Sequence, residues 1–374
     1  MLNSLEGRGK VMGISQHSLQ SSENVYSELT ASKKYIILGL VLALLVGIML
    51  AIVTGSADLS YHEVLQVILD RIVPSYTGEY SMLTETIVLN LRLPRIFLAV
   101  LGGFSLAGSG AVMQGVLRNP LADPYMLGIS AGASLGAALA VVLEANILKG
   151  FGLPVVYVMI GNAFVFGLLT MLVIYGIASL KGAAPETLIL AGVALGYLFS
   201  AGVSLLKYVS SHEQLRELSV WLMGGLWGAT WQAVLILLPI TLISIVLLMR
   251  YAWDLNALSA GEEVAANLGV NVPVLRRNCA ILASLLASAT VAFTGIIGFI
   301  GLVAPHICRF IIGNDNRFLI PCSCLMGGLL LLAADTVSRT IISPTEIPVG
   351  IITSLIGVPF FLYLLFKQER QWWA

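Results

Sequence analysis

Residues 35–54 read YIILGLVLALLVGIMLAIVT, twenty residues without one charged side chain. A helix rises 1.5 Å per residue, so about 20 residues cross the roughly 30 Å apolar layer of a bilayer. Comparable apolar runs follow along the chain. They predict about ten transmembrane helices, near residues 35–54, 95–115, 127–143, 153–180, 188–207, 231–250, 278–312 (two helices, broken near Gly295–Gly301), 318–334 and 347–366.

The composition excludes a soluble protein. Of the 374 residues, 58% are hydrophobic and 11% are charged, whereas soluble domains carry about 25% charged residues. A net charge of zero provides no bulk field for binding nucleic acid. We therefore expect an all-α integral membrane protein, with a polar N-terminal extension over residues 1–32 and a transmembrane domain over residues 33–370.

The lysines and arginines predict the orientation, because cytoplasmic loops carry an excess of them. With a cytoplasmic N-terminus, thirteen of the 20 fall inside and seven fall outside. The outside set is Arg71, Arg92, Arg95, Lys149, Lys207, Arg216 and Arg339. Both termini, and the 1–32 extension, are therefore expected in the cytoplasm.

Ionisable residues avoid the middle of every expected span. Ion-coupled transporters generally hold such a residue, or a cation site, near the midplane, so this pattern disfavours a secondary transporter. An intramembrane enzyme would need clustered His, Asp or Glu in the spans. Of the four histidines only His306 lies near one, and a structural role is expected for it.

No nucleotide-binding loop occurs either, since Gly9-Lys10 lacks the upstream glycine of a phosphate-binding loop. Any ATP hydrolysis that serves this chain would therefore occur on a partner chain. Cys279, Cys308, Cys322 and Cys324 lie in or beside apolar runs without metal-ligand spacing. They are expected to be small apolar fillers. We expect neither a disulfide, nor a metal site, nor a cofactor.

Glycine spacing predicts close helix packing. Gly128, Gly132 and Gly136 recur every four residues, and a similar run extends from Gly102 to Gly115. Such small-xxx-small ridges let membrane helices approach closely. A pore lining is a compatible alternative.

Three connecting stretches are too specific in composition to be plain turns. The first is Arg92-Leu93-Pro94-Arg95, where Pro94 starts a helix and two arginines are expected to face outward. The second runs from Met113 to Pro124 and forms a polar reversal on the cytoplasmic side. The third, residues 255–270, is predicted to hold one short helix, capped by Ser259 with Glu262 and stopped at Gly269.

These stretches, with others in the same order, resemble the FecCD family of ABC importer permeases, over about residues 35–368. The matching motifs are Arg92-Leu93-Pro94-Arg95, Gly110-Ala111-Val112-Met113-Gln114, Asn119-Pro120-Leu121-Ala122-Asp123-Pro124, Leu127-Gly128-Ile129-Ser130, Leu190-Ala191-Gly192, Trp221-Leu222-Met223-Gly224-Gly225, residues 298–306, Ala334-Asp335 with Arg339, Glu346-Ile347-Pro348-Val349-Gly350 and Gly357-Val358-Pro359-Phe360-Phe361. The 1–32 extension has no counterpart in this family pattern.

The resemblance implies the type II ABC importer architecture, with two permease copies, cytoplasmic ATPase subunits and an external binding protein. It implies binding-protein docking by Arg92, Arg95 and Arg339, and a cytoplasmic gate near Asn119. It assigns ATPase coupling to the loop holding Ser259, Gly261, Glu262, Glu263, Val264, Leu268 and Gly269. The implied substrate is a ferric siderophore, with cobalamin or haem as alternatives.

Overall fold

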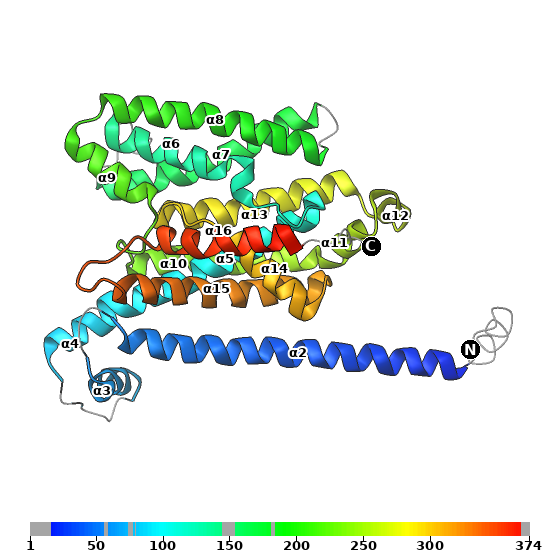
Figure 1. The fold of residues 1–374 in the computed structure, drawn as a ribbon, viewed down its shortest axis with the longest axis horizontal. Coiled ribbons are helices and arrows are strands. Elements are labelled where there is room, and N and C mark those ends of the chain that lie inside the picture. The colour runs from blue at the N-terminus through cyan, green and yellow to red at the C-terminus, as the bar shows by residue number, and fades with distance from the viewer. Residues whose placement is uncertain are drawn as a thin grey trace.

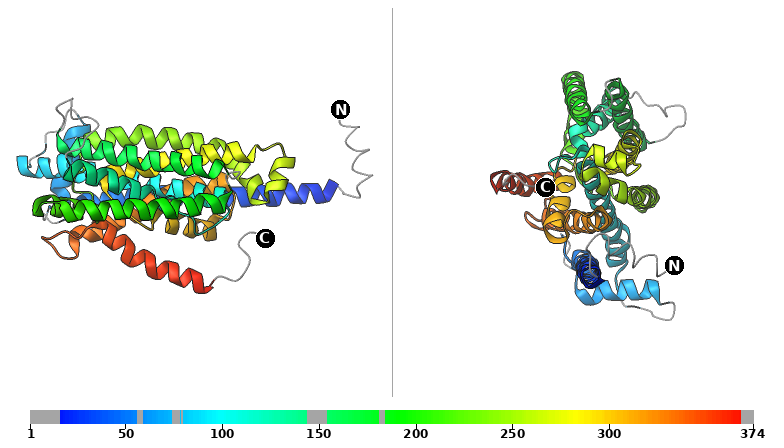
Figure 2. Two further views of the ribbon diagram at one scale, coloured as in Figure 1. Left: turned by 90° about the horizontal axis from the view of Figure 1, so that it is seen from above. Right: turned by 90° about the vertical axis from the view of Figure 1, so that its right-hand side faces the viewer.

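The computed structural model describes residues 16–55, 59–73, 78, 80–143, 154–180 and 184–367, and these residues form helices without strands. Figures 1 and 2 show a bundle of near-parallel helices. Among the described residues, ten helical segments are apolar enough for the membrane, which confirms the expected fold class. Seven are long, and three are shorter apolar helices.

Successive membrane segments alternate in direction along the bundle (Figure 1). Seven of them are long. They are α2 (Gln16–Val53), α4 (Met82–Thr86) continuing through η1 (Ile87–Arg92) into α5 (Leu93–Leu117), α7 (Val155–Ser179), α8 (Pro185–Val209), α10 (Trp231–Arg250), α13 (Val272–Thr294) and α15 (Asn316–Thr340). The shorter ones are α6 (Ile129–Val142), α14 (Ile300–Ile312) and α16 (Val349–Lys367).

Four further helices lie outside the spans, at the two ends of the bundle. At one end, the α4 end, α3 (Tyr61–Ile72) lies between α2 and α4 in the chain, and α9 (His212–Leu222) lies between α8 and α10. At the other, the α12 end, lie α11 (Ala252–Ser259) and α12 (Glu262–Asn267). Helix α2 begins and α16 ends at the α12 end, so an even number of crossings separates them (Figure 1).

Helix α5 is the centre of the packing. Nearly every residue from Ile96 to Leu117 is buried, and α5 contacts α10, α13, α14 and α15. It approaches α15 closely, since a Cβ on Gly103 would lie 2.2 Å from the Gly327 carbonyl oxygen. A Cβ on Gly327 would lie 2.3 Å from the Gly103 oxygen, so neither position has room for a side chain. The predicted close packing along this helix is confirmed.

The glycine ridge of α6 packs on α7 in the same way. A Cβ on Gly132 would collide with the Thr170 hydroxyl, and one on Gly136 would lie 2.4 Å from the Asn162 carbonyl oxygen. Gly128 precedes the helix with φ +70° and touches Gly192 of α8. These contacts give the ridge the packing role expected of it.

Two spans are half-length helices completed by irregular chain. Helix α13 ends at Thr294 and α14 begins at Ile300, which confirms the break expected near Gly295–Gly301. The link needs left-handed backbone, with φ +65° at Gly295 and +68° at Phe299. Helix α6 follows the short 3-10 helix η2 (Pro124–Leu127), whose N-terminus is capped by the Asp123 side chain. Buried irregular backbone of this kind is tolerated in membrane proteins where protein surrounds it.

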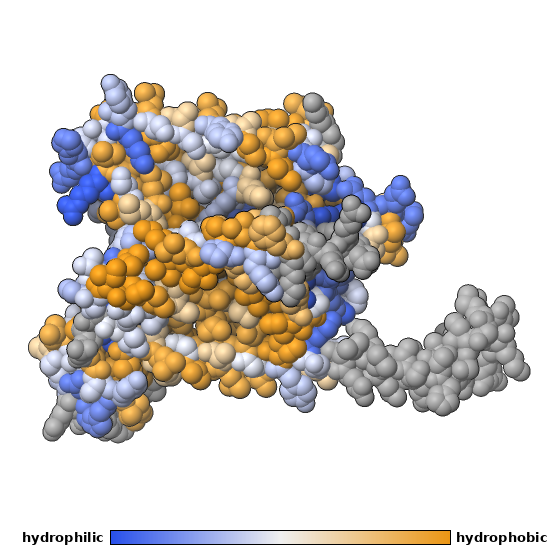
Figure 3. All heavy atoms as spheres, in the orientation of Figure 1, coloured by the Kyte–Doolittle hydropathy of each residue, from blue (hydrophilic) through white to orange (hydrophobic). Residues whose placement is uncertain are grey.

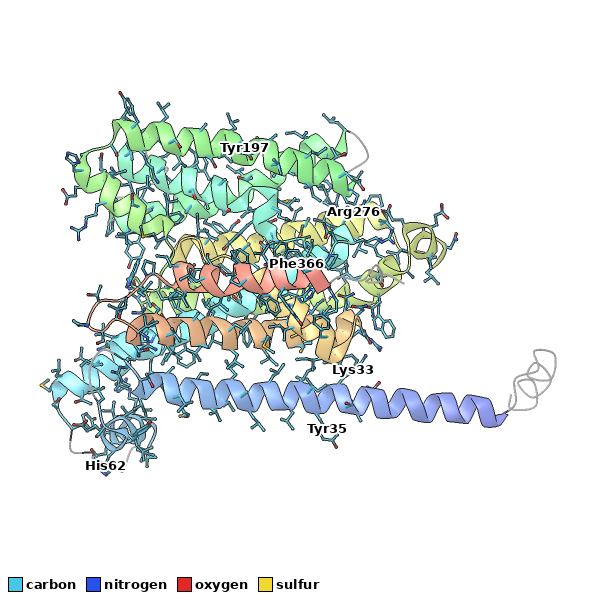
Figure 4. All side chains as sticks on the ribbon, in the orientation of Figure 1. Lys33, Tyr35, His62, Tyr197, Arg276 and Phe366 are labelled. Carbon is cyan, nitrogen blue, oxygen red and sulfur yellow. The ribbon has the colours of Figure 1, made fainter. Side chains whose placement is uncertain are left out.

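The flanks of the bundle are apolar and the ends are polar (Figure 3). Large apolar side chains point outward from α2, α8, α10 and α16, with Leu190 and Leu355 more than two-thirds exposed. The prediction stopped the polar extension at residue 32, yet α2 continues as one helix from Gln16 into the first span. In Figure 4, Lys33 points toward the bundle, where its ammonium lies 5.3 Å from the Phe318 ring centroid, whereas Tyr35 points away from it.

Candidate functional site: the two ends of the bundle

An ion cluster of Arg92, Arg95, Asp335, Arg339 and Glu346 occupies the α4 end, and we call it the α4-end ion cluster. Arg95, in the first turn of α5, reaches Asp335 of α15 at 2.8 Å and Glu346 at 2.7 Å. Arg339 lies one turn beyond Asp335 and pairs with it at 3.0 Å. The Asp335 carboxylate is therefore held between two guanidinium groups.

The other contacts of the cluster go to the C-terminus of α2. Arg92 donates to the carbonyls of Ile52 and Val53 at 2.6 and 2.7 Å. Arg339 donates to the carbonyls of Ala51 and Thr54 at 3.4 and 3.2 Å. The last carbonyls of a helix lack intrahelical partners and carry partial negative charge, so two arginines stabilise this end. The cluster thereby joins α2, α5 and α15.

The expectation that Arg92 and Arg95 face outward is wrong for the single chain, and Arg339 is buried as well. Arg92 is 5% exposed and Arg339 is 4% exposed, and the Arg95 side chain is 11% exposed. A desolvated guanidinium needs carboxylate or carbonyl partners, and these are 240 residues or more from Arg95 in sequence. The local motif around Arg92 and Arg95 contains no information about those distant partners.

At the α12 end, residues 255–270 form two helices where one was predicted. Ser259 is the last residue of α11 and its hydroxyl donates back to the Asn256 carbonyl at 2.6 Å, so the predicted Ser259–Glu262 capping box is wrong. Leu255 and Leu258 are fully buried, and their burial extends α11 past the expected cap. The chain then bends at Gly261, whose φ of +130° favours glycine.

Helix α12 ends as the sequence predicted. Gly269 has φ +87°. Its N–H donates to the Ala266 carbonyl, and the Val270 N–H donates to the Ala265 carbonyl. This pair of bonds is the Schellman motif, which fixes the end of a helix firmly.

The two faces of α12 differ in burial. Ala265 is buried against the bundle, while Val264 is 44% exposed and Leu268 is 69% exposed. Glu262 pairs with Arg276 of α13 at 2.6 Å, in the position that Figure 4 labels for Arg276. Glu263 is exposed beside the two apolar residues. A short, anchored helix thus presents an apolar ridge with a carboxylate to the surroundings.

Helix α11 is bonded to the start of α15 by side chains that the sequence reading did not single out. The Asn256 amide donates to Asp315 at 2.8 Å and accepts from the Asn316 N–H at 2.8 Å and the Asn316 amide at 2.9 Å. Arg317 pairs with Asp315 at 2.6 Å and stacks on Trp253, 4.0 Å from its ring centroid. We call these five residues the α11–α15 junction.

The Asp315 carboxylate is charged at neutral pH. Burial raises its pKa, but hydrogen bonds from Arg317 and Asn256 outweigh burial and hold the pKa below its ordinary value. Asp315 also caps the N-terminus of α15 by accepting from the Arg317 N–H. The charged Asp315 therefore stabilises the junction at pH values above its ordinary pKa. This stabilisation is lost as the pH falls through the lowered pKa.

Asn119, expected near a gate, lies in the turn that closes α5. Its side-chain oxygen accepts from the Leu121 N–H at 2.9 Å, and its own N–H donates to the Gln114 carbonyl. Beside this turn a cavity of about 420 Å³ opens at the α12 end, lined by Leu117, Arg118, Ala184, Pro185, Glu186, Glu262 and Arg276. The α5 turn and the start of α12 therefore border one polar opening.

The histidine and the cysteines considered in the sequence analysis lie in the packed interior of the bundle. His306 is buried in α14, with its ring edge-on to Phe310 and Phe360. The four cysteine side chains are buried, in line with their expected role as apolar fillers. Within the described residues, no group of three His, Cys, Asp or Glu side chains could hold a metal ion.

A helical bundle of ten membrane segments in the described residues, with the short helix α12 at one end and an ion cluster at the other, has the architecture of a type II ABC importer permease. The sequence profile of the FecCD transport family matches residues 43–367, and the chain belongs to that family. It is a multi-pass permease of the cell membrane.

Relatives and a solved structure agree with this assignment. The chain is 43% identical to the hemin transport system permease protein HmuU of Yersinia pestis, over 76% of this chain and 84% of that one. It is 45% identical to the cobalamin import system permease protein BtuC of Halobacterium salinarum, over 76% and 74%. A metal-chelate type ABC transporter solved in an inward-facing conformation superposes with a TM-score of 0.77 at 33% identity, covering 90% of this chain and 100% of that one.

Proposed function

We propose that this chain is the membrane subunit of a ferric-siderophore importer, powered by ATPase subunits that dock on α12. The observation that carries the proposal is the exposed ridge of Val264 and Leu268 on a helix anchored by the Glu262–Arg276 pair and the Gly269 stop. Solvent-exposed apolar side chains on so rigid an element favour a protein partner. Uptake into vesicles must then require ATP and the ATPase, and uptake that needs neither contradicts the proposal.

The α12 end is proposed to face the cytoplasm, as the excess of lysine and arginine predicts. A cysteine in place of His62, exposed on α3, should react with a membrane-impermeant thiol reagent in intact cells. A cysteine in place of Glu263, exposed on α12, should react only after the cells are opened. The native cysteines are buried, which keeps the background low. The reverse labelling pattern would invert the orientation and remove the ATPase from α12.

The α4 end is proposed to receive the external binding protein. The proposed contact with the binding protein is not made by all the arginines directly. Arg92 and Arg339 are buried and hold α2 in place, while Arg95 and Glu346 are the more exposed cluster members, which a partner can contact. The Glu346 side chain is 23% exposed. Exposed ion pairs are individually weak, yet charge complementarity sets orientation and association rate.

Arg95→Gln combined with Glu346→Gln removes one charge of each sign and leaves the Asp335–Arg339 pair in place. We expect this variant to fold but to bind the binding protein about tenfold more weakly, with a flatter salt dependence of the affinity. Affinity across a salt series measures both. Arg216→Gln with Glu213→Gln on α9, at the same end, is the matched control. If both variants bind the binding protein with the same affinity and the same salt dependence, the cluster has only a structural role.

The substrate is proposed to be a ferric siderophore, with haem and cobalamin as alternatives. Relatives of nearly equal identity are named for different cargoes, so overall similarity does not choose among them. A path without ionisable side chains at the middle of the expected spans suits a bulky chelate delivered by a partner. Two permease copies are proposed to enclose that path, with Asn119 of each copy near its cytoplasmic gate.

A further inference from the structure

One link between the proposed docking element and the membrane part runs through α15, beside the direct Glu262–Arg276 pair to α13. Helix α12 follows α11 after a two-residue bend, and α11 is held to the first turn of α15 by the α11–α15 junction. Asn256 bonds through its donor to Asp315, which caps α15, and through its acceptor to Asn316, the first residue of α15. Trp253 adds a second contact on the same face of α11, because the two residues are three apart.

Helix α15 then connects the two ends of the bundle. Nineteen residues separate Asn316 from Asp335, which corresponds to roughly 28 Å of helix. Asp335 and Arg339 at its far end belong to the α4-end ion cluster. Gly327 and Gly103 approach backbone to backbone, so no side chain fits between α15 and α5 at this point. In the coupling route, a displacement of the first turn is carried past Pro321, which lies within the helix, to its far end.

We propose that Asn256 is the positioning residue that couples α12 to α15, so that movement of the ATPase-docking helix reaches the α4-end ion cluster. The inference rests on the proposed ATPase docking at α12, and it adds the route by which that docking acts. Helix α11 is already packed by Leu255 and Leu258, so the Asn256 hydrogen bonds are not needed to hold α11 against the bundle. These hydrogen bonds instead fix the position of α11 relative to the start of α15, so the two move together.

The test uses the full permease in complex with its ATPase in nanodiscs. An environment-sensitive fluorophore on a cysteine at Val337, 41% exposed near the far end of α15, reports movement there. ATP with vanadate should change its emission in the otherwise unaltered complex. Asn256→Leu should keep ATPase assembly and ATP hydrolysis but reduce that emission change about tenfold, the scale expected when a partly buried hydrogen-bond set that biases two states is lost.

Asn278→Leu is the matched control. It removes another partly buried amide near α11, one that donates to the Tyr251 hydroxyl at 2.9 Å rather than to α15. The emission change should survive in this variant. An unaltered response in Asn256→Leu, or no ATP-dependent response in the unsubstituted complex, overturns the proposal. Leu268→Asp tests the docking separately: normal ATPase binding in that variant would remove α12 as the docking site and with it this coupling route. An unaltered response in Asn256→Leu removes the route alone.

A reciprocal swap keeps the test decisive if Asn256→Leu does not fold. Asn256→Asp alone places two carboxylates side by side, because the amide that donated to Asp315 is gone. Asn256→Asp with Asp315→Asn restores a donor facing an acceptor and leaves an N-cap residue before α15. The double variant should recover the emission change that the single variant loses. A double variant no better than Asn256→Asp contradicts the coupling role.

Discussion

Replacing Leu268 by aspartate should detach the ATPase from this permease while leaving the membrane part folded. Leu268 is 69% exposed and contributes nothing to the buried core, so a charge there does not disturb the bundle. In a protein interface a few central apolar residues carry most of the affinity, and truncating one costs about 2 kcal/mol, roughly thirtyfold in binding. A carboxylate desolvated at that position should cost more.

The measurement is co-purification of the ATPase with the permease, together with ATP hydrolysis by the isolated complex. Leu180→Asp is the matched control, since Leu180 ends α7 at the same end of the bundle and is 86% exposed. It should bind the ATPase normally. Full assembly of the Leu268→Asp complex with normal transport would rule out α12 as the docking element.

Removing the charge of Asp335 should have the largest effect on stability. Asp335 is fully buried between Arg95 and Arg339, at 2.8 and 3.0 Å. Asp335→Asn preserves the shape but leaves the neighbouring guanidinium charges undercompensated in a buried site, which typically costs about 3–5 kcal/mol. We expect a lower unfolding temperature in detergent and a smaller folded fraction after purification.

Charge balance predicts which second change should help. Asp335→Asn combined with Arg339→Gln removes one charge of each sign and should recover part of the lost stability, although the α2 carbonyls then lose a donor. Glu213→Gln on α9 changes an exposed carboxylate at the same end and should leave the unfolding temperature unchanged. A stability of Asp335→Asn equal to that of the control would mean that the cluster contributes little to the fold.

The spans were predictable because each depends on its own residues. Residues 231–250 were predicted as a span, and α10 has those same bounds, since a long apolar run must be helical to satisfy its backbone in lipid. The break after Thr294 was readable from Gly295 and Gly301 for the same local reason. The shorter end helices α3 and α9 had signals too, in the capping boxes Ser60–Glu63 and Ser211–Gln214.

The sites were less predictable because they depend on residues distant in sequence. Arg92 and Arg95 were expected at the surface, but their partners come from α2 and α15. The Ser259 cap failed because burial of Leu255 and Leu258 extended the preceding helix. Asn256 has no motif at all, and only the fold brings it to Asp315 and Asn316.

The central claim is that ATP hydrolysed by a partner drives import through this chain. Its most direct test is uptake of a radiolabelled ferric hydroxamate into proteoliposomes containing the permease and its ATPase, with the binding protein present and haemin and cyanocobalamin offered in parallel. The account predicts uptake of the ferric chelate that requires ATP on the ATPase side and survives a protonophore. Uptake driven by an ion gradient without ATP would contradict it.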